Sequence, residues 1–148
     1  MDYQEYQNRI QRGTQMFEAG NMQAALEVFQ GLVNSDISDI DKARMCINVA
    51  VVYERNDNPQ QALQWYMRGV QYEKPHCRFE AQEYLAVYLT ELGRLRDSLK
   101  VYDSLLPSSH LTEEDKLRFR QRIEELKKEL NKPVYRRPGT GELTGGGS

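Results

Sequence analysis

The sequence predicts an all-α fold, an α-solenoid of about seven helices in which antiparallel helical hairpins follow one another. The first observation behind this prediction is an aromatic residue that recurs at Phe29, Tyr66 and Tyr102, at spacings of 37 and 36 residues. A small residue stands four positions before each aromatic, and an apolar residue stands three positions after it. This spacing is typical of one face of an amphipathic helix.

The second observation is a turn upstream of each of these helices. The turns contain Gly20-Asn21, Asp57-Asn58 and Gly93. Glycine, asparagine and aspartate tolerate the left-handed conformation that ends a helix. Each copy of the pattern is therefore predicted to be a helix, a turn and a second helix, with repeats at about 6–37, 43–74 and 79–107.

Local signals predict where the helices begin. Asn21 is a predicted N-cap, Ser38 with Asp41 resembles a capping box, and proline follows Asn58 at a first helical position. Pro75 is interpreted in the same way, as a first-turn residue of a fifth helix that carries Phe79 and runs to Gly93. The sixth helix is expected to end at Leu106-Pro107.

A seventh helix without the repeat pattern is predicted at 113–130, opened by Thr112. Its apolar residues Phe119, Ile123, Leu126 and Leu130 form a single stripe on a charged helix. Such a helix can cap the open apolar end of a stack of hairpins, or it can dimerise through its stripe. Residues 131–148 contain many glycines and few apolar residues, and are interpreted as a flexible tail or linker.

The repeated residues resemble the tetratricopeptide repeat (TPR) family over about Ile10 to Leu106. They are Gly13, Met16, Gly20, Ala25 and Phe29; Ala50, Tyr53, Asp57, Ala62 and Tyr66; and Leu85, Ala86, Leu89, Gly93, Ser98 and Tyr102. The chain departs from the family pattern at Arg9 and Arg12, where large apolar residues are usual, and at Ser98, which replaces a packing alanine. The resemblance implies a right-handed superhelix of hairpins.

Composition excludes several classes of function. With 28% charged residues and a net charge of −2, the chain lacks the basic bias of a nucleic-acid-binding protein. It also lacks an apolar run long enough to span a membrane and the features of a secretory signal, so we expect a cytoplasmic protein. Cys46 and Cys77 are expected to be reduced packing residues.

Residues suited to catalysis are few. His76 and Cys77 are adjacent, His110 lies far along the chain, and the Cys and His spacings typical of metal sites do not occur. The prediction is therefore a protein that is not an enzyme, with no cofactor and no metal.

The TPR resemblance implies a concave groove lined by the first helix of each hairpin. The residues predicted to bind a partner there are Ile10, Thr14, Arg44, Asn48, Val51, Glu80, Tyr84 and Val87. Ile10, Ile47, Val51, Tyr84 and Val87 would form an apolar floor, with Arg44 facing Glu80 and Glu83. The alternative for Ile47 and Val51 is that they pack between repeats.

The chaperone-docking subfamily of TPR proteins holds carboxylates with a clamp of lysine, asparagine and arginine. Only Asn48 matches that clamp here, and Glu80 would repel a carboxylate. We therefore expect a non-catalytic scaffold or adaptor that binds some other peptide or protein segment in the groove. The alternative is a structural unit that assembles with copies of itself.

Overall fold

The computed structural model describes residues 1–133, and this range contains seven α-helices, one short 3-10 turn and no strand. The helices confirm the predicted all-α class. Their bounds are α1 Tyr3–Glu18, α2 Met22–Val33, α3 Asp39–Arg55, α4 Pro59–Glu73, α5 Glu80–Glu91, α6 Leu95–Leu105 and α7 Glu113–Leu130, with η1 at Lys74–His76. Most of the predicted tail, from residue 134 onward, lies outside the described residues. No helix within residues 1–133 combines the length and apolar character needed to cross a membrane.

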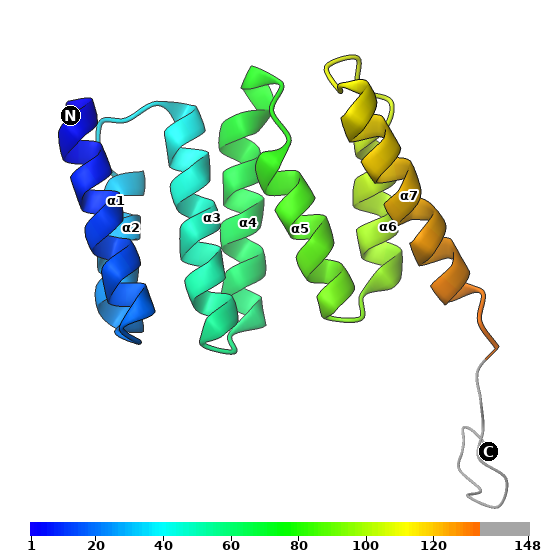
Figure 1. Ribbon diagram of the computed structural model, residues 1–148, viewed down its shortest axis with the longest axis horizontal. Helices are drawn as coiled ribbons and strands as arrows, with labels where there is room; N and C mark the ends of the chain where they lie inside the picture. Colours follow the sequence, from blue (N-terminus) through cyan, green and yellow to red (C-terminus); the bar gives the residue numbers. More distant parts are fainter. Residues whose placement is uncertain (134–148) are drawn as a thin grey trace, which may run out of the picture.

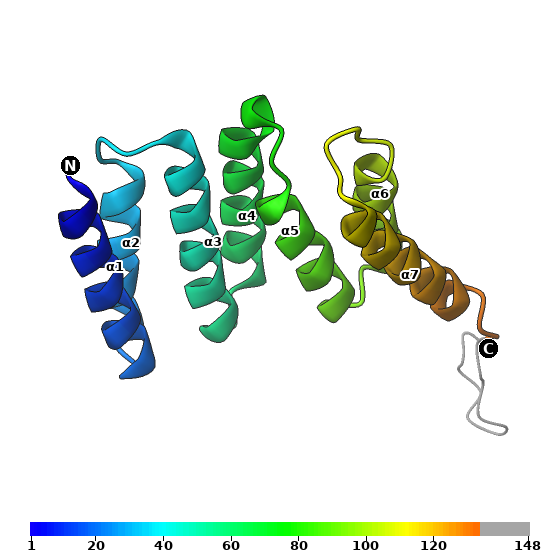
Figure 2. The ribbon, with the colours of Figure 1, turned by 45° about the horizontal axis from the view of Figure 1, so that its top comes forward.

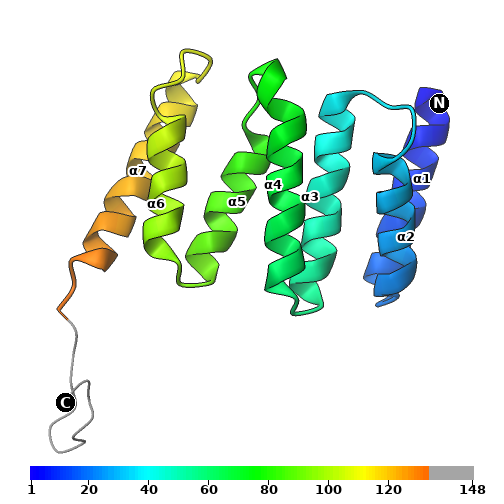
Figure 3. The ribbon, with the colours of Figure 1, turned by 180° about the vertical axis from the view of Figure 1, so that it is seen from behind.

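Consecutive helices pack against one another in a row (Figure 1). Helices α1, α3, α5 and α7 lie on one side of the row, and α2, α4 and α6 lie on the other, as the view from behind shows (Figure 3). The N-terminus and α7 are at opposite ends (Figure 2). We call the side formed by α1, α3, α5 and α7 the odd-helix face. These four helices run in the same direction, which places their carboxyl ends together.

Each hairpin is held by an aromatic ring from its second helix that packs on a small residue of its first helix. In the first hairpin this pair is Phe29 and Gly13, where a Cβ added to the glycine would lie 2.6 Å from Cε1 of Phe29. The equivalent pairs are Tyr66 with Ala50 and Tyr102 with Ala86, and each of these pairs lies in one core cluster. All six residues are buried.

Ser98 shows how the third hairpin accommodates a polar residue at a packing position. Its side chain is fully buried. The Oγ donates a hydrogen bond of 2.7 Å to the backbone carbonyl of Ala86 and lies 2.7 Å from Oγ1 of Thr90. Because the hydroxyl is paired, its burial does not carry the penalty of an unsatisfied polar group.

The turns inside the hairpins have the predicted conformation. Gly20, Asp57 and Gly93 have φ values of 84°, 54° and 78°, in the left-handed region that ends a helix. The predicted N-caps also form, because the side chains of Asn21 and Asn58 accept backbone N–H groups of Ala24 and Gln61. Ser38 and Thr112 cap α3 and α7 in the same way.

The prediction for the start of α5 was wrong. Pro75 lies in the 3-10 turn η1, which ends at the left-handed Cys77 (φ 56°), and α5 begins only at Glu80 with Phe79 as its N-cap residue. The cap comes from the preceding helix, because the buried carboxylate of Glu73 accepts the backbone N–H of Gln82 at 3.2 Å. Burial raises the pKa of Glu73, and the backbone N–H groups at the start of α5 oppose this effect.

The two cysteines differ in their surroundings. Both are free. Cys46 is fully buried in the core of the first two hairpins, and burial raises the pKa of its thiol to about 11. Cys77 is exposed, so the expectation that it is a packing residue was wrong. It lies in the turn before α5 rather than in a helix.

Helix α7 covers the end of the third hairpin. Phe119, Ile123 and Leu126 are buried in one cluster with Tyr102 and Leu105 of α6. The ring centroids of Tyr102 and Phe119 are 5.7 Å apart. The apolar stripe is therefore used within the chain and packs as a cap does, rather than being open to a second copy.

Replacing Gly13 by alanine tests the packing of Phe29. Its ring is 3% exposed and has little space to move away from a new Cβ, so we expect Gly13→Ala to lower the free energy of unfolding by about 1 to 3 kcal/mol in urea denaturation. The control is Gly31→Ala in α2, where a Cβ meets nothing within 4 Å. That change should raise stability by up to about 1 kcal/mol through helix propensity. Equal stabilisation by both changes would contradict the close packing.

Replacing Phe119 by alanine tests the role of α7. Its side chain is 1% exposed, so Phe119→Ala should lower the free energy of unfolding by about 3 to 5 kcal/mol, seen as a large fall in melting temperature. Leu117 on the same helix is 67% exposed, and Leu117→Ala should change stability by less than about 0.5 kcal/mol. If the two variants have the same melting temperature, α7 does not stabilise the third hairpin.

Candidate interaction surface

The odd-helix face is hollowed between α1, α3 and α5. The hollow has a volume of about 350 Å³. Five of the predicted binding residues line it, namely Ile10, Arg44, Asn48, Glu80 and Tyr84. They come from three helices that are adjacent only because the hairpins pack side by side.

A second hollow, of about 200 Å³, continues along the same face. Thr14 and Val51 line it, and it shares Ile47, Asn48 and Tyr84 with the first. We call these two adjoining hollows the groove. The structure thus brings seven of the eight predicted residues to one groove, while Val87 lines a separate hollow beside α7.

Tyr84 keeps an open aromatic surface in the groove. Its side chain is 45% exposed, and Val87 one turn further along α5 is 38% exposed. The inner side of the Tyr84 ring stacks on Tyr66, with centroids 6.3 Å apart. This packing fixes the ring in place while its outer side faces solvent.

Part of the predicted apolar floor is used inside the protein. Ile47 is only 6% exposed and belongs to the core that joins the second and third hairpins. Val51 is half-buried against the same core. For Ile47, packing between repeats is therefore the correct interpretation, whereas Ile10 and Val51 keep part of their surface in the groove.

Asn48 lies at the centre of the groove, where both hollows meet. Within residues 1–133 its side chain makes one hydrogen bond, a weak one of 3.8 Å from Nδ2 to Sδ of Met45. Sulfur is a weak acceptor. The amide can therefore pair with the backbone of a bound segment without losing a strong internal partner.

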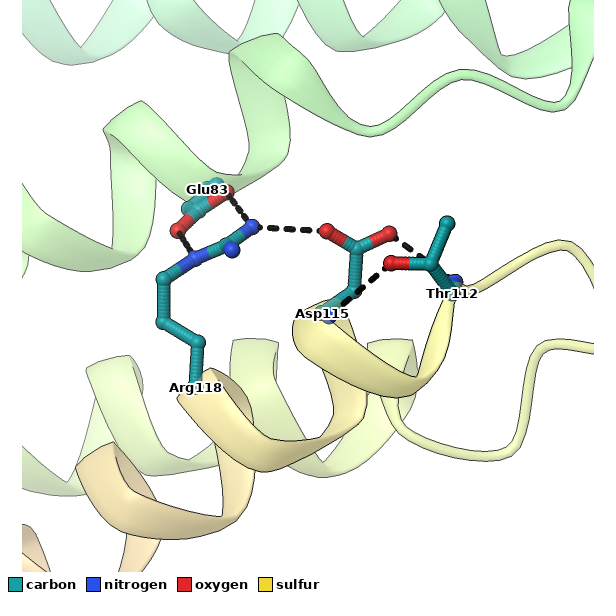
Figure 4. Close-up of polar contacts among 4 residues, drawn as sticks. All are labelled: Glu83, Thr112, Asp115 and Arg118. Atoms are coloured by element: carbon teal, nitrogen blue, oxygen red, sulfur yellow. Dashed lines mark hydrogen bonds and ion pairs between the residues drawn. The ribbon is translucent and has the colours of Figure 1, made fainter.

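Two groups of ion pairs line the odd-helix face near the amino ends of α3, α5 and α7. Arg44 lies 3.5 Å from Glu80, as expected, and 3.9 Å from Asp41. Arg44 and Glu83 line one hollow, but among the described residues no ion pair joins them. The carboxylate of Glu83 instead accepts two hydrogen bonds, of 2.7 and 3.0 Å, from Arg118 of α7 (Figure 4).

Arg118 is held in place by the start of its own helix. Its Nη2 donates to Asp115 at 2.9 Å, and Asp115 also accepts the backbone N–H of Thr112 in a capping box (Figure 4). The Thr112 backbone and Arg118 both stabilise the charged carboxylate, which lowers the pKa of Asp115. Sequence reasoning missed Arg118 because α7 has no repeat pattern. The spacing of three residues from Asp115 was the available signal.

Two further titratable side chains, His76 and Tyr66, are engaged by neighbours. His76 Nε2 lies 3.0 Å from Asp39, and the buried Tyr66 hydroxyl donates to Glu54. Burial raises the pKa of both Tyr66 and Glu54. Among residues 1–133, no group of three or more His, Cys, Asp and Glu side chains is placed to share a metal ion.

Comparison with known proteins identifies a family but no activity. The model of the family described as "Domain of unknown function (DUF6340)" matches residues 11–94, which is 84 of the 148 residues. The chain belongs to this family. No curated protein matches the sequence.

The DUF6340 match covers most of the groove. It runs from within α1 to the turn after α5. The predicted residues Thr14 to Val87 all fall inside it, and Ile10 lies one position before it. Helices α6 and α7, with Arg118, lie beyond the match. The groove is thus largely a feature of the DUF6340 region, and the ion pair to α7 is added by the sequence that follows.

Replacing Asp115 by asparagine tests the network at the start of α7. A carboxylate with a lowered pKa stabilises the fold above its unfolded pKa of about 4 and loses that contribution as the pH falls through its folded value. We expect Asp115→Asn to cost about 1 kcal/mol near neutral pH, and the difference from the unmodified chain to shrink at about pH 3. Thermal melts across this range measure it, with the exposed Asp103→Asn as control. A difference that does not depend on pH would contradict the pairing.

Proposed function

We propose that this protein is a non-catalytic interaction module of the TPR type, which binds an extended or helical segment of a partner protein in the groove. The observation that carries the proposal is Tyr84. It is a large aromatic side chain, 45% exposed and held by Tyr66, at the point where the two hollows of the groove adjoin. Exposed, preorganised tyrosines are typical anchors of protein interfaces.

The surroundings of Tyr84 support a protein segment as the ligand. Asn48 offers an amide for backbone hydrogen bonds, while Ile10 and Val51 add apolar contact. The net charge of −2 favours a protein partner over a nucleic acid. A soluble scaffold or adaptor in the cytoplasm, without a bound cofactor, is the role that these features suit best.

The TPR assignment is supported by the hairpins themselves. The small residue, the aromatic residue and the left-handed turn recur at equivalent positions in all three hairpins. A row of such hairpins presents the first helices on one side as a shared binding surface.

Self-assembly, the alternative function, has weaker support. The stripe of α7 is buried within the chain. The outer side of the first hairpin has a hollow of about 520 Å³, but it carries Arg9, Arg12 and Glu27. A polar outer face is typical of an end cap. We therefore place a homo-oligomer second, and light scattering over a concentration series would detect it.

The double variant Asn48→Ala with Tyr84→Ala tests the proposed groove. Both side chains are at least partly exposed, so the helical circular dichroism should not change, whereas capture of partners from the native cell should fall at least tenfold if Tyr84 is a hot spot worth about 1.4 kcal/mol or more. The control is Met67→Ala, a 56% exposed residue of α4, away from the groove. Quantitative mass spectrometry of the captured proteins measures the effect. The same partners retained by the double variant would rule out the groove.

A further inference from the structure

The hollow beside α7 combines an apolar floor with an acidic rim. It has a volume of about 420 Å³ and lies between α5, α6 and α7. Val87, Leu95 and Leu126 line it with carbon atoms, and Tyr102 adds part of its ring. An open apolar hollow of this kind suits the aliphatic part of a bound side chain.

The rim of this hollow carries an excess of negative charge. Glu91, Glu125 and Glu129 line it, against one cation, Arg122. Arg122 lies 3.4 Å from Glu125, and Glu129 pairs with Lys132 at 3.0 Å. Glu91 is exposed and makes no ion pair within residues 1–133.

Further negative charge lies next to this rim. Burial raises the pKa of Glu54 at the end of α3, and the nearby charge of Glu91 raises it further. Burial also raises the pKa of Tyr88, with Glu54, Asp57 and Glu91 adding to the effect. The carboxyl ends of α3 and α5 therefore bring Glu54, Asp57 and Glu91 within reach of one another's charge, with Arg55 beside them.

The direction of the helices adds partial negative charge at the carboxyl ends of α5 and α7, and the last turn of α7 also carries Lys127 and Lys128. Helices α5 and α7 end at Glu91 and Leu130. Figure 1 shows that these carboxyl ends lie at the same end of the odd-helix face. The carboxyl end of a helix carries a partial negative charge and favours cations. At the opposite end of the face, the carboxylates of Glu80 and Glu83 are already paired with arginines.

We infer that the hollow beside α7 binds an arginine or lysine side chain, next to an aliphatic residue, from an extended partner segment that runs along the odd-helix face. The aliphatic stem of the basic side chain would pack on Val87 and Leu126, while its charged end would reach Glu91, the rim glutamate without an ion pair within residues 1–133. This inference rests on the proposed function and adds a preference for basic segments. It also orients the segment, because its basic residue would lie at the carboxyl ends of α5 and α7.

Three matched fluorescein-labelled peptides test the inference on the full chain. Their sequences are GSLRLRSG, GSLELESG and GSLQLQSG, and fluorescence anisotropy gives the three dissociation constants. We expect the arginine peptide to bind about tenfold or more tightly than the glutamine peptide, and the glutamate peptide to bind weakest. The advantage of the arginine peptide over the glutamine peptide should shrink when the salt concentration rises from about 0.05 to about 0.5 M.

Two charge reversals locate the binding. Glu91→Lys should weaken the arginine peptide about tenfold and improve the glutamate peptide. It should fold normally, because Glu91 is exposed and lysine is favoured at the carboxyl end of a helix. The control is Glu124→Lys, which makes the same charge change on α7 outside the hollow and should alter binding less than about twofold.

Each other outcome overturns the inference in a recognisable way. Equal binding of the three peptides, or equal effects of Glu91→Lys and Glu124→Lys, would show that the hollow does not select a basic side chain. If partner capture still depends on Tyr84 in that case, the proposed function stands and only the basic preference fails. If the arginine peptide binds only after Arg136→Ala with Arg137→Ala, the occupant is the chain's own tail rather than a partner. Dimers that exclude the peptide would make a second copy the occupant.

Discussion

The packing of an aromatic ring on a small residue determines the architecture of this protein. Phe29, Tyr66 and Tyr102 can lie close to the first helix of their hairpins only because Gly13, Ala50 and Ala86 leave room there. Interiors are packed too densely for a larger residue to fit without displacing the ring. Because the same contact is made three times, the hairpins have similar shapes and can follow one another in a regular row.

This regularity is what produces the candidate interaction surface. The odd-numbered helices run in one direction, so side chains from α1, α3 and α5 meet at one groove although they are far apart in sequence. The same arrangement separates charge along the face. Arg44 and Arg118 pair with the carboxylates at the amino ends, whereas Glu91 at the carboxyl end of α5 makes no ion pair within residues 1–133. A single packing rule thus sets both the shape and the polarity of the surface.

The sequence predicted the features that depend on local spacing, such as the helices, the left-handed turns and the N-caps. It also predicted residues that share one side of the row, and seven of the eight candidates line the groove. The predictions failed where contacts between residues far apart in the sequence determine the structure. Glu73 of α4 caps α5, and α5 therefore begins at Glu80 rather than at Pro75. Glu83 pairs with Arg118 from a helix outside the repeats, and the burial of Ile47 depends on how two hairpins pack.

The central claim is that the hairpins share one packing contact and thereby bring α1, α3 and α5 to a common face. Nuclear Overhauser effects in solution test it most directly. The account predicts contacts from the rings of Phe29 and Tyr66 to Gly13 and Ala50, and from the Tyr84 ring to Ile47 across two hairpins. Contacts within the hairpins but none from Tyr84 to α3 would show that the hairpins form without a common face, and would contradict the account.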